Sequence, residues 1–166
     1  MILGMSTDTF TLLHVVISLI GIASGIIVLF GMFASNRMSG WTALFLLTTV
    51  LTSVTGFLFS SAGFTPAQEV GIVSLVLLAA ALLARYVFRL AGAWRWIYVV
   101  GAVIALYLNC FVAVVQAFQK LPFLQPLAPT QSEPPFQIAQ GIVLVLFLVA
   151  GIVALRRFHP EARLAV

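Results

Sequence analysis

The chain has 166 residues, of which 63% are apolar and only 7% are charged. Soluble proteins carry about a quarter charged residues, so this composition excludes an ordinary soluble domain and predicts a membrane protein.

The first predicted helix, residues 9–33, carries a narrow face of small and polar side chains. Four residues recur at the spacing that places them on one side of a helix: His14, Ser18, Gly21 and Gly25. The rest of the helix is mainly Val, Ile and Leu, which lipid solvates well. We therefore expect the small face to be the side on which another helix packs closely.

Four further stretches are long and apolar enough to span a bilayer, which takes about 20 helical residues. They are residues 41–60, 66–90, 94–118 and 135–157. Thr65, Pro66 and Gln68 have the pattern of a capping box with a proline in the first turn, which separates the second span from the third. The sequence therefore predicts an all-α, five-helix transmembrane bundle that forms one domain over residues 1–166.

The segment between the last two spans is rich in proline and does not favour a regular helix. Residues 119–135 hold five of the seven prolines. We expect residues 119–134 to form an outer loop that lies on the interface or over the mouth of the bundle.

The charge distribution predicts the orientation. With five spans, all seven arginines fall on one side and Lys120 falls on the other. The positive-inside rule then places the C-terminus in the cytoplasm and the N-terminus outside, in a multi-pass protein of the inner (plasma) membrane. The residues assigned to topology or to lipid headgroups are Arg85, Arg89, Arg95, Arg156 and Arg157. No basic patch with interleaved aromatic residues indicates a nucleic-acid partner, so the expected partner is the lipid bilayer.

Small and hydroxyl-bearing residues extend the packing face of the first helix onto its neighbours. The full predicted packing seam consists of Ser18, Gly21, Gly25, Thr52, Ser53, Gly56 and Ala105. Serine and threonine are tolerated in such a seam because their hydroxyls can bond the carbonyl of the preceding turn.

Polar side chains are concentrated in the outer half of the predicted bundle, whereas its cytoplasmic half is nearly all Leu, Val, Ile and Ala. Asn109 lies near the middle of its span, where an unpaired amide would cost several kcal/mol, so it must face protein, water or a ligand. This pattern is typical of a pocket. The candidate ligand-binding residues are His14, Glu69, Asn109, Gln116 and Gln140.

His14 is the only ionisable residue more than one turn inside a span, which makes it a functional candidate. It could accept a proton, ligate a metal or haem, or pair with Glu69 or Asp8, or it could bond only to water or a neighbouring glutamine. Haem ligation through His14 is a minor alternative, because His159 lies at the opposite end of the bundle and one chain cannot use both for one haem. No pattern predicts a metal site, and the cofactor is left undefined.

The sequence holds no nucleophile elbow, P-loop, dinucleotide fingerprint or acidic metal cluster, so no catalytic residue is assigned and a non-enzymatic role is favoured. The leading hypothesis is an accessory or assembly subunit, or a homo-oligomer, that works by packing against a membrane-protein partner. One alternative is binding or transport of a small molecule, proton or lipid through the outer pocket. Another is a redox subunit that binds haem or quinone near His14.

Overall fold

The computed structural model describes residues 2–59, 63 and 65–160, and this part of the chain is all-α. Its α-helices are α1 (Thr7–Phe33), α2 (Ser39–Gly56), α3 (Pro66–Leu82), α4 (Trp94–Lys120) and α5 (Pro134–Arg157). A π-helical turn, η1 (Leu83–Val87), continues α3, and a short 3-10 helix, η2 (Gln125–Leu127), lies between α4 and α5. The prediction of five helices is confirmed.

Four of these helices are long and apolar enough to cross a membrane, namely α1, α3 with η1, α4 and α5. The remaining helix, α2, has only 18 residues and is rich in serine and threonine, and its length is about 27 Å at 1.5 Å per residue. The chain is therefore a small polytopic helical membrane protein, whereas a fifth span through α2 stays a prediction.

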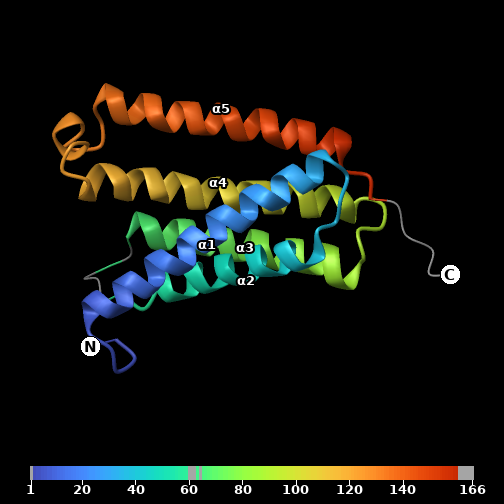
Figure 1. Cartoon of the computed structure of the whole chain (residues 1–166), viewed down its shortest axis with the longest axis horizontal. Coiled ribbons are helices and arrows are strands. Elements are labelled where there is room, and N and C mark those ends of the chain that lie inside the picture. Colours follow the sequence, from blue (N-terminus) through green and yellow to red (C-terminus); the bar gives the residue numbers. More distant parts are fainter. Residues whose placement is uncertain (1, 60–62, 64, 161–166) are drawn as a thin grey trace.

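The helices form a bundle in which α1 lies diagonally across its neighbours (Figure 1). α1 packs on α2 along most of its length, α3 packs on α4, and α5 packs on the far side of α4. α5 is the most peripheral helix, because Ala154 is its one buried residue. Ile142, Val145 and Val149 are each more than half exposed on α5, as expected for a helix that faces lipid.

Local sequence signals set several of the helix ends. The predicted capping box is confirmed, because Thr65 Oγ1 accepts from the backbone N–H of Gln68 and the Gln68 side chain accepts from the N–H of Thr65. The predicted end of the second helix is wrong by four residues. α2 ends at Gly56, which lacks a side chain and favours a helix terminus. The third helix also ends before residue 90, where Arg89 and Leu90 adopt positive φ angles of 50° and 65°.

Glycines bring α1 into close contact with α2 and α4. A Cβ atom added at Gly25 would lie 2.5 Å from Leu106 Cδ1 on α4 and 2.8 Å from Phe45 Cε2 on α2. One turn earlier, the same construction at Gly21 would lie 3.4 Å from Thr49 Oγ1 and 3.6 Å from Asn109 Nδ2. The packing seam predicted on α1 therefore lies inside the bundle, where the three helices cross.

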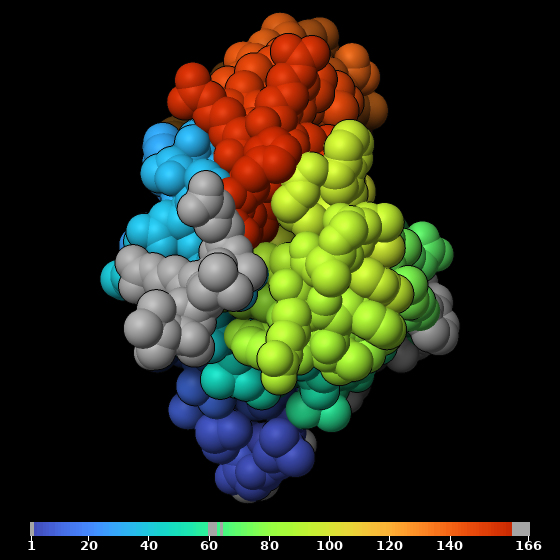
Figure 2. Space-filling model, turned by 90° about the vertical axis from the view of Figure 1, so that its right-hand side faces the viewer, coloured from blue at the N-terminus to red at the C-terminus, as the bar shows by residue number. Residues whose placement is uncertain are grey.

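Arginine side chains join the elements at the end of the bundle that holds the α1–α2 turn. Arg85 is only 8% exposed, and its Nη2 donates to the carbonyl of Arg37 at 2.9 Å. Arg95 Nη1 donates to the carbonyl of Phe158, just after α5, at 2.6 Å. Figure 2 shows this end, where the α1–α2 turn, the start of α4 and the end of α5 meet. We call these two bonds the arginine clamp.

The structure thus separates the arginines that the sequence grouped together. Arg85 and Arg95 bond to carbonyls of other elements, whereas three are exposed: Arg89, Arg156 and Arg157. Only the exposed ones are free to meet lipid headgroups without breaking a bond inside the bundle.

Candidate functional site

A cavity of about 750 Å³ lies between α1, α2, α3 and α4, at the end of the bundle that holds the N-terminus. It is lined by the N-terminal halves of α1 and α3 and the C-terminal halves of α2 and α4, which meet there because consecutive helices run in opposite directions. The volume falls within the range of about 300–1,000 Å³ that is usual for small-molecule sites. We call it the α1–α4 cavity.

The cavity follows from the way α1 crosses the bundle. α1 is held against α4 near Gly25, and from there towards the N-terminus the two helices diverge (Figure 1). The side chains in the space between them are too short to fill it. The small residues that line the cavity are Ser18, Ser53, Gly56, Gly71, Ser74 and Ala113.

His14 lines the cavity in a fixed orientation. Its Nδ1 lies 2.7 Å from Thr55 Oγ1, and that hydroxyl donates its own proton to the carbonyl of Leu51 at 2.7 Å. We assign the tautomer with the proton on Nδ1, because His14 can then donate to Thr55 while the Thr55 hydroxyl keeps its bond to Leu51. The Phe59 ring packs edge-on against the imidazole with the ring centroids 5.2 Å apart.

The other ring nitrogen of His14, Nε2, is left for a ligand. Within the described residues no side chain or backbone group bonds to Nε2. Nε2 is also not one of the fully buried polar atoms that lack a partner, so it is accessible. A neutral imidazole with its proton on Nδ1 carries a free lone pair on Nε2. His14 can therefore accept one hydrogen bond from a molecule in the cavity.

Asn109 and Gln116 approach the same cavity from α4. Asn109 Nδ2 donates to Thr49 Oγ1 at 3.3 Å, which links α4 to α2 next to Gly21. Gln116, two turns further along α4, lines the cavity, and its side chain forms no hydrogen bond with a described residue. The structure thus brings together three of the residues that the sequence selected: His14, Asn109 and Gln116.

The remaining two candidates lie elsewhere. Glu69 is exposed and does not belong to the described lining of the cavity. Gln140 also lies outside that lining, and its Nε2 donates to the carbonyl of Phe111 at 3.1 Å, which joins α5 to α4. Both residues lie near the predicted end of the bundle, but their side chains are not on the sides of α3 and α5 that face the cavity.

The cavity also contains residues that the sequence did not select as ligand contacts. Gln68 and Ser74 contribute from α3, and Lys120 contributes from the last turn of α4. Lys120 carried a usable signal, because it is the only basic residue on its side of the predicted membrane.

The floor and the rim of the cavity differ in exposure. Ser53 and Ser74 are 8% and 2% exposed and form the floor between α2 and α3. Val15 and Leu19 on α1 are 37% and 56% exposed. Val15 and Leu19 therefore form an apolar part of the rim beside α1, and the exposed Lys120 forms a charged part at the end of α4.

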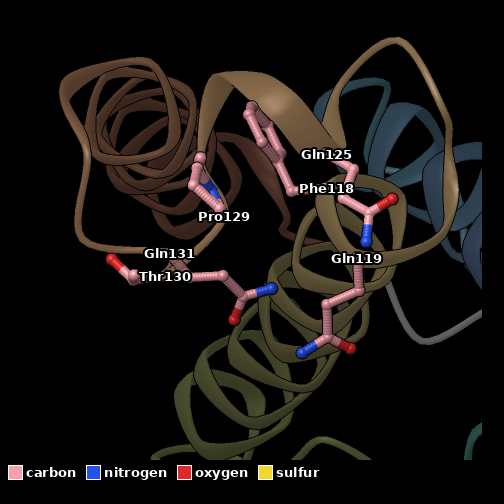
Figure 3. Close-up of a pocket in the computed structure, with 7 residues that line it drawn as sticks. Phe118, Gln119, Gln125, Pro129, Thr130 and Gln131 are labelled. Atoms are coloured by element: carbon pink, nitrogen blue, oxygen red, sulfur yellow. The ribbon is translucent and has the colours of Figure 1, made fainter.

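The proline-rich segment encloses a second, smaller pocket of about 210 Å³ beside the end of α4. Figure 3 shows Gln119, Gln125 and Gln131 around it. Gln131 Nε2 donates to the carbonyl of Val115 at 3.2 Å, which fastens the segment to α4. Of residues 119–134, only Lys120 at the end of α4 and Leu121 belong to the described lining of the α1–α4 cavity, so most of the segment expected to cover the mouth of the bundle lies outside that lining.

In the described residues no group of three His, Cys, Asp or Glu side chains is arranged to hold a metal ion. Comparison of the chain with protein-family models, with curated proteins and with solved structures gives no match, so the functional inference depends on the cavity and its side chains.

Proposed function

We propose that this membrane protein binds an amphipathic small molecule or lipid in the α1–α4 cavity. The observation that carries the proposal is the cavity of about 750 Å³, which has a polar floor and an apolar rim. Such a combination suits a ligand that has a polar head and an apolar body, because each part then meets surface of its own kind. A ligand of this kind can enter from the bilayer past Val15 and Leu19.

The packing of α1 argues against the alternative of an assembly subunit. That hypothesis needs small-residue seams that remain available to another protein. In the structure Gly21 and Gly25 are buried against α2 and α4, and Ala105 is fully buried as well. Because the chain uses these residues for its own packing, they support a stable cavity better than a docking face.

We further propose five spans, with α2 as the short one and with the N-terminus outside. In this arrangement the exposed Arg89, Arg156 and Arg157 lie together on the cytoplasmic side, in agreement with the positive-inside rule. Lys120 and the α1–α4 cavity then lie at the outer side of the inner membrane, and the ligand comes from the outer leaflet.

Native mass spectrometry of the protein, extracted from its own membrane in mild detergent, tests the proposal. We expect a retained small molecule on the wild type and its loss in Ala113→Trp, which places an indole in the cavity one turn before Gln116. Val145→Trp is the matched control, because Val145 is 59% exposed on α5 and outside the cavity. Val145→Trp should keep the ligand.

The same spectra decide between the alternatives. An oligomer or a complex with another chain that carries no small molecule would refute ligand binding and favour the assembly hypothesis. The redox alternative can be checked in the same sample, because a bound haem at His14 would give a Soret absorption band.

A further inference from the structure

The two sides of the α1–α4 cavity differ in the hydrogen bonds that they can form. On the side of α1 and α2, the hydroxyls of Ser18, Thr52 and Ser53 donate to carbonyls three or four residues earlier in their own helices, at 2.7, 2.8 and 3.0 Å. Each hydroxyl has one proton, so while these bonds are kept the oxygens act as acceptors towards a ligand. His14 Nε2 is an acceptor for the same reason, because the imidazole proton is held on Nδ1 by Thr55.

The opposite side, from α3 and α4, contains groups that can donate. They are Ser74, Asn109, Gln116 and Lys120. The Asn109 side chain donates one N–H to Thr49 and retains a second, and the Gln116 side chain forms no hydrogen bond with a described residue. A ligand head in this cavity therefore meets acceptors on one side and, on the other side, groups that can donate as well as accept.

This division selects among the common classes of amphiphile. A carboxylate or a quinone carbonyl can only accept, so it would leave the acceptors of α1 and α2 unpaired and would be repelled by their lone pairs. An ammonium head can only donate, and it would share the cavity with the Lys120 cation. A hydroxyl group both donates and accepts, so it satisfies both sides.

We infer that the ligand is a neutral lipid alcohol, phenol or hydroquinone whose O–H donates to His14 Nε2 and whose oxygen accepts from the α4 side. This inference rests on the proposed function and specifies its ligand class. His14 lies seven residues into α1, about 10 Å from its start, and Gln116 lies one turn before the end of α4. The head is therefore held below the end of the bundle, and the apolar chain leaves past Val15 and Leu19.

Matched pairs of probes test this inference on the full-length protein in lipid nanodiscs. The probes are decylhydroquinone with its dimethyl ether, and dodecanol with its methyl ether; the ethers keep the shape but cannot donate. We expect each compound with a hydroxyl group to bind with a Kd roughly tenfold lower than that of its ether. A tenfold ratio corresponds to the one hydrogen bond to His14 that the ether cannot donate. The pair whose hydroxyl compound binds more tightly identifies the head group as aromatic or aliphatic.

Variants assign the effect to His14. His14→Phe keeps a ring of similar size without an acceptor, and it should remove the preference for the hydroxyl compounds. Val16→Phe, on the exposed side of the same helix, is the control and should retain the preference. Thr55→Val leaves the imidazole in place but releases Nδ1, so it should reduce the preference and provides a second test if His14→Phe does not fold.

The outcomes separate this inference from the proposed function. Equal binding of the ethers and the hydroxyl compounds, tighter binding of dodecanoate or decylquinone, or an unchanged preference in His14→Phe would overturn the hydroxyl assignment. In each of these cases sensitivity to Ala113→Trp would still support a ligand in the cavity. Absence of any binding, together with no retained molecule in the native spectra, would overturn both.

Discussion

Gly25 offers the most direct test of the close crossing of α1, α2 and α4. In Gly25→Ala the new methyl group would lie 2.5 Å from Leu106 Cδ1 and 2.8 Å from Phe45 Cε2, whereas carbon atoms are normally about 3.5–4.0 Å apart. Leu106 and Phe45 are 2% and 1% exposed, so neither can move aside without displacing other buried groups. The overlap of about 1 Å at two contacts must be relieved by moving these buried side chains or by shifting a helix.

The magnitude follows from two opposing terms. Overpacking of this kind costs about 1–3 kcal/mol, and two simultaneous contacts place Gly25→Ala in the upper part of that range. Replacing glycine by alanine inside a helix returns up to about 1 kcal/mol. We therefore expect the free energy of unfolding to fall by about 1–2 kcal/mol.

Reversible unfolding in mixed detergent micelles, followed by circular dichroism, measures this change. Gly141→Ala is the control, because nothing lies within 4 Å of a Cβ added at Gly141 and that residue is exposed on α5. The control should be unchanged or slightly stabilised. If Gly25→Ala were as stable as Gly141→Ala, the tight crossing that creates the α1–α4 cavity would be refuted.

Three further changes test other parts of the structure. Arg85→Ala should lower the free energy of unfolding by about 1–3 kcal/mol, because it removes the hydrogen bonds from a buried guanidinium to the Arg37 carbonyl and the Ser39 hydroxyl, whereas the exposed Arg89→Ala should have little effect on the same unfolding curve. Thr65→Ala removes the capping box and should cost about 0.5–2 kcal/mol, seen as faster hydrogen exchange in the first turn of α3. Desolvation raises the pKa of Glu133, but hydrogen bonds from the Thr130 hydroxyl and from nearby backbone N–H groups outweigh it and lower the pKa below its ordinary value. The stabilisation from this carboxylate is therefore complete above its ordinary, unfolded pKa and is lost as the pH falls through the lowered folded pKa. Hydrogen exchange in residues 129–133 should accelerate in that pH range. Glu133→Gln should remove this acid-dependent acceleration.

The sequence predicted best what depends on depth and on local signals. The capping box at Thr65 involves residues within one turn, so no tertiary information was needed. The convergence of His14, Asn109 and Gln116 followed from helix length and alternating direction, because these two properties fix how far each residue lies from the ends of the bundle. The capping box is confirmed, and the structure places these three side chains around one cavity, whereas their role as ligand contacts stays a prediction.

The sequence could not predict which way each helix faces. Glu69 and Gln140 have the right depth, but the rotation of a helix about its axis is set by packing against its neighbours, and in lipid most of the surface is apolar on every side. Gln140 faces α4 instead of the cavity for this reason.

The burial of Arg85 was also beyond the sequence pattern. An arginine at the end of an apolar span is usually assigned to the headgroup region. Here Arg85 lies in η1, where the helix widens to a π-helical turn, and it is directed at the α1–α2 turn instead. Neither the π-helical turn η1 nor the bond from Arg85 to the Arg37 carbonyl has a sequence pattern from which it could be predicted.

The arginine clamp makes the bundle mechanically asymmetric. Arg85 and Arg95 fasten helix ends together on one side, whereas the α1–α4 cavity separates the helices on the other. The distance along α1 from Gly25 to its start at Thr7 is about 27 Å. A rotation of α1 by about 5° at the crossing would therefore move its start by roughly 2 Å. Small rotations at the Gly25 crossing would thus move the start of α1 more than its clamped end, because that end lies only eight residues from the crossing, so the volume of the α1–α4 cavity is easier to change than the packing at the clamp.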